Sequence, residues 1–149
     1  MKIPYGIHYL DRRDIESVSN ALRQKFITQG SIVEKFESKI CKLVKSKYAV
    51  AVSSCTAGLH IAIAAVDKSK NRNEIITSPI SFVSTANTII MNNYKVNFTD
   101  INNESLNIDV ENFSKKIKKN KKTNIVIPVH LGGLAADSKK IYQLCKKKK

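Results

Sequence analysis

The feature that most constrains the fold is an alternation of short apolar runs with segments of helical periodicity, which starts at residue 48. The runs expected to be strands are residues 48–52, 74–77, 96–99 and 125–129. The segments expected to be helices are residues 56–66, 81–91, 109–118, with Asp109 as N-cap, and 138–145. Because strands that alternate with helices pair in parallel, the sequence predicts an α/β fold. Its sheet is mostly parallel, with helices on both faces.

Two amphipathic helices are expected before this alternation. Apolar residues recur at helical spacing across residues 11–26, and Thr-Gln-Gly at residues 28–30 interrupts the pattern. A second helix is expected to begin at Ser31, where Ser31 and Glu34 have the spacing of a capping box.

The length and composition indicate one globular domain. The chain has 149 residues, of which 42% are hydrophobic, enough for one core. Its longest unbroken apolar run, residues 61–66, is far shorter than a membrane span, and charged residues occupy the place of a signal peptide. Three cysteines without CxxC or Cys/His spacing indicate neither a disulfide framework nor a zinc site, and no metal is expected. These features predict a cytoplasmic protein.

The net charge of +14 raises the alternative of nucleic-acid binding. Residues 1–114 contain 14 lysines and arginines against 11 acidic residues, whereas residues 115–149 contain 12 lysines against Asp137 alone. These lysines form runs without arginine and with few aromatic residues, as solvated helix faces do. We therefore expect neither a nucleic acid nor a membrane as partner.

Ligands of open α/β sheets bind at the carboxyl ends of strands, so the strand-to-helix turns are the candidate sites. The first turn is Ser-Ser-Cys-Thr-Ala-Gly at residues 53–58. Its small residues and free N–H groups at a helix start could hold a phosphate. The alternative is an ordinary N-cap by Ser54 or Thr56.

Two further turns carry unusual residues. In the turn after the second predicted strand, Phe82 could stack on a planar ring or be one more core residue. After the last predicted strand, His130 precedes Gly132 and Gly133. Because no carboxylate or cysteine partner is identifiable beside it, a structural hydrogen bond is the favoured interpretation of His130 over catalysis.

Six segments, taken in order, closely resemble the DegT/DnrJ/EryC1/StrS family of sugar aminotransferases. They are residues 3–6, 25–30, 49–60, 73–87, 107–109 and 128–133. The stretch Asn-Glu-Ile-Ile-Thr-Ser-Pro-Ile-Ser-Phe at residues 73–82 favours the branch of pseudaminic acid synthesis. The resemblance implies a dependence on pyridoxal 5'-phosphate (PLP). It also implies that residues 31–149 are an incomplete PLP-binding large domain of fold type I, after an arm and helix over residues 1–30.

The resemblance also implies site residues. The cofactor-binding residues it implies are Cys55, Thr56, Ala57 and Phe82, the first three at the phosphate and Phe82 on the pyridine ring. Cys55 stands where the family commonly has a small residue such as alanine. The substrate-binding residues it implies are Tyr5, Lys25, Phe26, Ile27 and Thr28. A homodimer of the full-length protein is expected, with part of each active site supplied across the interface.

The reaction implied is amino transfer, from glutamate, to C4 of a UDP-linked 4-keto-6-deoxy sugar. The Schiff-base lysine and the aspartate that pairs with the pyridine nitrogen are expected to lie beyond residue 149, so no catalytic residue is assigned here. We expect a chain cut short before these residues. Two alternatives stay open: an aminotransferase of another nucleotide-sugar, of the perosamine type, or a non-catalytic α/β fragment that binds a sugar-nucleotide or phosphate.

Overall fold

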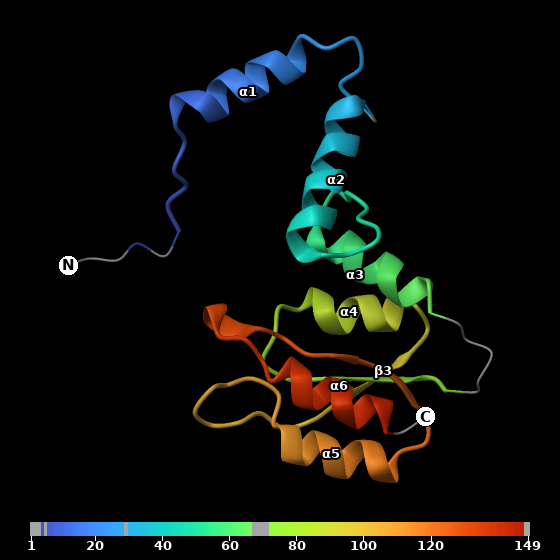
Figure 1. Cartoon of the computed structure of the whole chain (residues 1–149). Coiled ribbons are helices and arrows are strands. Elements are labelled where there is room, and N and C mark those ends of the chain that lie inside the picture. Colours follow the sequence, from blue (N-terminus) through green and yellow to red (C-terminus); the bar gives the residue numbers. More distant parts are fainter. Residues whose placement is uncertain (1–3, 5, 29, 67–71, 148–149) are drawn as a thin grey trace. The chain divides into compact units, whose positions relative to one another are not determined.

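The computed structural model describes residues 4, 6–28, 30–66 and 72–147, and it divides into two compact units. One unit spans residues 1–51 and the other residues 52–149 (Figure 1). None of the helices that these described residues form is both long and apolar enough to cross a lipid bilayer. The expected boundary at residue 30 stays a prediction.

The first unit contains two helices, α1 (Arg12–Leu22) and α2 (Ser31–Val44). A capping box begins α1: Asp11 accepts from the N–H groups of Arg13 and Asp14, and the Asp14 carboxylate accepts from the Asp11 N–H. The capping box expected at Ser31 is wrong. Ser31 is already the first helical residue, so Gly30 is the N-cap and no side chain caps α2.

Gly30 is required at this position for a steric reason. A Cβ built on Gly30 would lie 2.7 Å from the carbonyl oxygen of Phe26, closer than a real Cβ comes to backbone. The chain between α1 and α2 therefore folds back tightly on itself, which explains the break in helical periodicity that the sequence shows at residues 28–30.

The second unit begins with α3 (Cys55–Ala64), β1 (Glu74–Thr77), α4 (Ser84–Met91) and β2 (Lys95–Phe98). It continues with α5 (Val110–Lys119), β3 (Thr123–Ile127), the short 3-10 helix η1 (Leu131–Gly133) and α6 (Ser138–Lys146). The three strands pair in parallel in the order β2-β1-β3. The predicted α/β class with a parallel sheet is confirmed.

Side chains that alternate along the strands build a core on each face of this sheet. On one face Ile75 of β1 packs with Ile63 of α3 and Ile89 of α4. On the other face Ile76 packs with Phe113 of α5 and Ile141 of α6, among other apolar residues. The sheet therefore lies between two helical layers, α3 with α4 and α5 with α6 (Figure 1).

Three predicted strands differ from the structure, and β2 differs least, since it begins and ends one residue earlier than predicted. Residues 48–52 form no strand, and the Ala51 N–H, which a strand would use for pairing, donates instead to the carboxylate of Glu37 at 2.7 Å. The last strand ends at Ile127, two residues earlier than predicted, because Pro128 has no N–H to donate to a ladder. Asp109 caps α5 as predicted, its carboxylate accepting from the Asn112 N–H at 2.6 Å.

Candidate functional site

The three turns singled out in the sequence lie at one edge of the second unit. Because β1, β2 and β3 are parallel, their carboxyl ends share this edge, which we call the carboxyl edge. Figure 1 shows that α3 and α4 run in the same direction and both begin there. The amino ends of two helices and the turns after β1 and β3 thus converge at the edge where such folds bind ligands.

The turn before α3 combines a capped helix start with two available donors. Ser54 is the N-cap, and its hydroxyl oxygen accepts from the Ala57 N–H at 3.1 Å, so Ser54, not Thr56, fills the capping role. The N–H groups of Cys55 and Thr56 meet no acceptor within the described part of the chain. Cys55 is exposed, and Thr56 and Ala57 are half-buried. Two free N–H groups at the positive end of a helix dipole can hold an anion.

The turn between β1 and α4 leaves its aromatic residue outside the core. The Phe82 side chain is 75% exposed, so within these 149 residues it does not have the core role that a phenylalanine most often has. Ser78 anchors this turn: its side chain is fully buried, and its hydroxyl donates to the Ile80 carbonyl oxygen at 3.3 Å. An exposed ring on an anchored turn is available to stack on a planar group. The assignment of Phe82 to the planar ring of the cofactor stays a prediction, which the exposure of its ring supports.

The turn after β3 is held by two side chains. The His130 Nδ1 atom accepts from the Ala136 N–H at 2.9 Å, so the structural role favoured for His130 is the one observed. Asn107 is buried; its Oδ1 accepts from the Leu131 N–H at 3.0 Å and its Nδ2 donates to the Leu134 carbonyl oxygen at 2.9 Å. Sequence reasoning missed Asn107, although it belongs to the Asn-Ile-Asp segment that carried part of the resemblance.

Glycine is needed within this turn. Gly132 and Gly133 have φ values of 58° and 84°, in the left-handed region that side chains disfavour. Apart from the two adjoining residues, no described residue has an atom within 4 Å of a Cβ built on either glycine, so backbone conformation, and not crowding, requires glycine here. The turn therefore exposes backbone at the carboxyl edge.

A hydroxyl also ties the carboxyl ends of the strands together. Thr77, the last residue of β1, is fully buried, and its Oγ1 donates to the carbonyl oxygen of Ile127, the last residue of β3, at 2.9 Å. The Thr99 N–H, just after β2, donates to the Thr77 carbonyl oxygen at 2.9 Å. These bonds fix the position from which each turn leaves the sheet.

The predicted substrate-binding residues belong to the first unit. Lys25, Phe26, Ile27 and Thr28 lie between α1 and α2 and are exposed, with the Lys25 Nζ atom 5.6 Å from the centre of the Phe26 ring. Tyr5 lies outside the described residues. The structure thus brings the four cofactor-binding candidates into one unit and these four substrate-binding candidates into the other.

The shifted acidic groups do not belong to these turns. Hydrogen bonds from Asn120 and Asn97, with help from Lys122 and Lys95, lower the pKa of Glu74 from its ordinary value near 4.5, against the opposing effect of burial. Bonds from the backbone and side chain of Lys140 lower the pKa of Asp137, the N-cap of α6. Within the described ranges, His, Cys, Asp and Glu side chains nowhere gather in a group of three that could hold a metal ion.

Comparison with known proteins identifies the family. The model of the DegT/DnrJ/EryC1/StrS aminotransferase family matches residues 8–149, nearly the whole sequence. The chain belongs to this family. The resemblance inferred from the six segments is confirmed, and so is PLP, at the level of the family, as the expected cofactor.

Among curated members of the family, the spore coat polysaccharide biosynthesis protein SpsC of Bacillus subtilis is 37% identical over 135 residues. That match covers 91% of this chain and 34% of SpsC. The UDP-4-amino-4,6-dideoxy-N-acetyl-beta-L-altrosamine transaminase of Campylobacter jejuni is 32% identical over 147 residues, which cover 97% of this chain and 38% of the enzyme. The chain thus spans about a third of the length of these relatives.

A solved structure of the same family extends the likeness to three dimensions. The aminotransferase PseC of Helicobacter pylori, involved in the biosynthesis of pseudaminic acid, superposes with a TM-score of 0.91 at 34% identity. The superposition covers 99% of this chain and 39% of PseC. The chain therefore has the α/β fold of part of a fold-type I PLP-dependent transferase, as the sequence predicted.

Proposed function

We propose that this family member is part of a PLP-dependent aminotransferase that transfers an amino group to C4 of a UDP-linked 4-keto-6-deoxy sugar in nucleotide-sugar biosynthesis. The observation that carries the proposal is the match to PseC over 99% of the chain at 34% identity. The altrosamine transaminase of C. jejuni, 32% identical over 147 residues, supports the same branch, that of pseudaminic acid synthesis.

The carboxyl edge offers groups that fit the cofactor. The free N–H groups of Cys55 and Thr56 would hold the phosphate dianion, and the small side chain of Ala57 leaves the backbone accessible. The exposed ring of Phe82 would cover one face of the pyridine. When bound, PLP supplies the electron sink on which amino transfer depends.

The substrate side of the proposal rests on the first unit and on a second subunit. Lys25 to Thr28 are exposed, and we assign to this segment, together with Tyr5, contacts with the sugar-nucleotide. Lysine would offer a point charge for the diphosphate. We further propose glutamate as the amino donor, a cytoplasmic homodimer as the full-length assembly, and a Schiff-base lysine and a pyridine-binding aspartate outside these 149 residues.

A chimera tests this function. Residues 8–149 replace the matching segment of H. pylori PseC, and the product is incubated with PLP, glutamate and a UDP-linked 4-keto-6-deoxy sugar. We expect the chimera to bind PLP and to aminate C4, detected by mass spectrometry and by the position of the new amine in NMR spectra. PseC itself serves as the positive control.

The result also separates the alternatives. A chimera that binds PLP but aminates a GDP-linked 4-keto sugar in preference to the UDP-linked one would contradict the proposed substrate and favour the perosamine type. A folded chimera that binds the sugar-nucleotide and holds no PLP would contradict the enzymatic assignment and favour a non-catalytic α/β fragment.

A further inference from the structure

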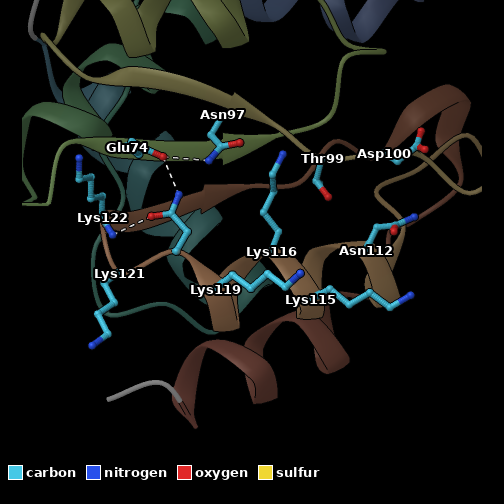
Figure 2. Close-up of a pocket in the computed structure, with 11 residues that line it drawn as sticks. Glu74, Asn97, Thr99, Asp100, Asn112, Lys115, Lys116, Lys119, Lys121 and Lys122 are labelled. Atoms are coloured by element: carbon cyan, nitrogen blue, oxygen red, sulfur yellow. Dashed lines mark hydrogen bonds between the residues drawn. The ribbon is translucent and has the colours of Figure 1, made fainter.

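An open groove of about 890 Å³ runs beside β2, the edge strand of the sheet (Figure 2). We call it the lysine groove because five of its lining residues are lysines, which come from α5 and from the turn that follows it. These are Lys115, Lys116, Lys119, Lys121 and Lys122. Figure 2 shows Asn97 of β2, and Thr99 just after this strand, on the other side of the groove. None of its residues is among those proposed above to bind PLP or the sugar-nucleotide.

The positive charge of the lysine groove is not neutralised internally. Among the described residues that line the groove, Glu74 and Asp100 are the two carboxylates against five lysines, a formal surplus of three positive charges. Both carboxylates are occupied by neutral donors: Glu74 Oε2 accepts from the Asn97 and Asn120 amides at 2.9 and 2.6 Å, and Asp100 Oδ1 from the Ile101 N–H at 2.8 Å. No lysine of the groove forms an ion pair with any carboxylate that the structure describes.

The lysines differ in how firmly they are held. Lys116 is half-buried and its Nζ atom donates to the carbonyl oxygen of Phe98 in β2, which fixes one ammonium group in the groove. Lys115 and Lys119 of α5 and Lys122 of the turn after it are exposed and extend at separate points along the groove (Figure 2). Several like charges around one hollow repel one another, and a ligand that carries several negative charges at short spacing would relieve that repulsion.

The lining also indicates what kind of anion fits. The described lining residues include no aromatic residue and no arginine, so they offer no platform on which a base could stack and no planar fork for bidentate recognition. Its lysines supply point charges, and Asn112 and Thr99 supply polar side chains. Such a surface can select a ligand by its charge and by the spacing of its phosphates, but it cannot distinguish one base from another.

We propose that the lysine groove binds a short chain of phosphate groups, such as inorganic tripolyphosphate or the triphosphate of a nucleotide. Binding is expected to be weak and salt-sensitive because the lysines are mostly exposed. Tripolyphosphate and a nucleotide triphosphate present the same chain of phosphate groups to the lysines. The adenosine part of ATP is therefore expected to add nothing to the affinity.

Calorimetric titration of the whole chain with tripolyphosphate tests the proposal. We expect saturable binding of one ligand, and a dissociation constant at least tenfold higher in the triple variant Lys115→Gln, Lys119→Gln, Lys122→Gln. The corresponding Lys→Arg triple variant should bind as the unaltered chain does, since it keeps all three charges. It also shows whether any loss in the first variant comes from charge or from damage to the fold.

A matched control removes three lysines that do not line the groove. The variant Lys118→Gln, Lys139→Gln, Lys147→Gln has the same net charge as the first variant, and we expect its affinity to change less than twofold. Equal weakening by both triple variants, or no saturable binding, would overturn the proposal in favour of general charge attraction.

Two further ligands, ATP and an oligonucleotide, show which kind of phosphate compound the lysine groove prefers. ATP should bind within threefold of tripolyphosphate, which supports recognition of the phosphate chain alone. If ATP binds tenfold more tightly, the base is recognised and the proposal is overturned. A single-stranded oligothymidylate that binds through the same three lysines more tightly than tripolyphosphate does would also overturn it, in favour of nucleic acid.

Discussion

The buried amide of Asn107 donates to the carbonyl oxygen of Leu134 at 2.9 Å, across 27 residues of sequence. The same side chain accepts from the Leu131 N–H at 3.0 Å, so one amide closes both ends of the turn that contains Gly132 and Gly133. This turn follows β3 at the carboxyl edge, where the proposed cofactor site lies. Asn107 therefore acts as a positioning residue for that edge.

Replacement of Asn107 by Ala should destabilise the chain by about 1–3 kcal/mol, because two partly buried hydrogen bonds to the backbone are lost. The expected change is in the free energy of unfolding, measured in urea, with loss of hydrogen-exchange protection at the Leu131 N–H. Asn103→Ala, at an exposed asparagine of the same loop, is the control and should change the free energy of unfolding by less than about 0.5 kcal/mol. Equal effects of the two substitutions would contradict the role given to Asn107.

Acid should destabilise the chain partly through Glu74. Its pKa is lowered in the folded state, chiefly by the hydrogen bond from Asn120, so its contribution is fully present above the unfolded value near 4.5. That contribution is lost as the pH falls through the lower, folded value. Urea midpoints measured from pH 5 to pH 3 should therefore fall less steeply in Glu74→Gln than in the unaltered chain.

The control for this titration is Glu104→Gln, at an exposed residue whose side chain forms no hydrogen bond with another described residue. Its midpoints should follow those of the unaltered chain. If Glu74→Gln and the unaltered chain lose stability in parallel on acidification, the carboxylate of Glu74 is not the group that titrates.

The 149 residues by themselves should not transaminate a UDP-linked keto-sugar. None of their lysines stands in a Ser-x-His-x-x-Lys pattern, the context that the resemblance to the family implies for the Schiff-base lysine. A coupled assay for glutamate-dependent amination should give no signal above a sample without protein. Ordinary turnover would show that one of these lysines performs the chemistry and that the lysine assignment is wrong.

Phe82 should distinguish PLP from inorganic phosphate. The ring is 75% exposed, so Phe82→Ala removes little packing and is expected to leave the fold intact. It should weaken PLP binding and leave phosphate binding unchanged, because only PLP has a ring to stack on. Phe98→Ala is a useful control, since Phe98 is also exposed but belongs to the edge strand β2. Equal loss of both ligands in Phe82→Ala would point to a change in the turn instead.

Local sequence signals predicted most of the second unit. Strand β1 has the predicted bounds of residues 74–77, because its apolar run is short and bounded by polar residues and Pro79. The N-cap of α5 was also recoverable, since Asp109 stands directly before a strongly amphipathic segment. In both places one local pattern allows only one structure.

The sequence predictions were wrong or incomplete where the local structure depends on hydrogen-bond partners that are distant in the sequence. Residues 48–52 have the composition of a strand, yet a strand needs a neighbour, and Glu37 takes the N–H of Ala51. Asn107 was missed for the same reason, because its partners lie in residues 131–134 and nothing local marks the side chain as buried. The exposure of Phe82 likewise depends on packing that periodicity does not report.

The central claim is that Cys55, Thr56 and Ala57, at the start of α3, bind the phosphate group of PLP. Two substitutions probe the electrostatics of this site. Thr56→Asp should weaken phosphate binding by placing a negative charge beside the ligand, and Thr56→Ala should weaken it less. The affinity itself is expected to be near millimolar, equivalent to about 4 kcal/mol, because a helix terminus acts without a covalent link.

A titration of the whole chain with PLP, followed by backbone amide chemical shifts, tests this claim most directly. We predict saturating shifts at residues 54–58, with smaller changes at Phe82, and weaker binding in Thr56→Asp. Shifts confined to the lysine runs of residues 115–122 and 139–147, with residues 54–58 unaffected, would contradict it and leave plain charge attraction as the explanation.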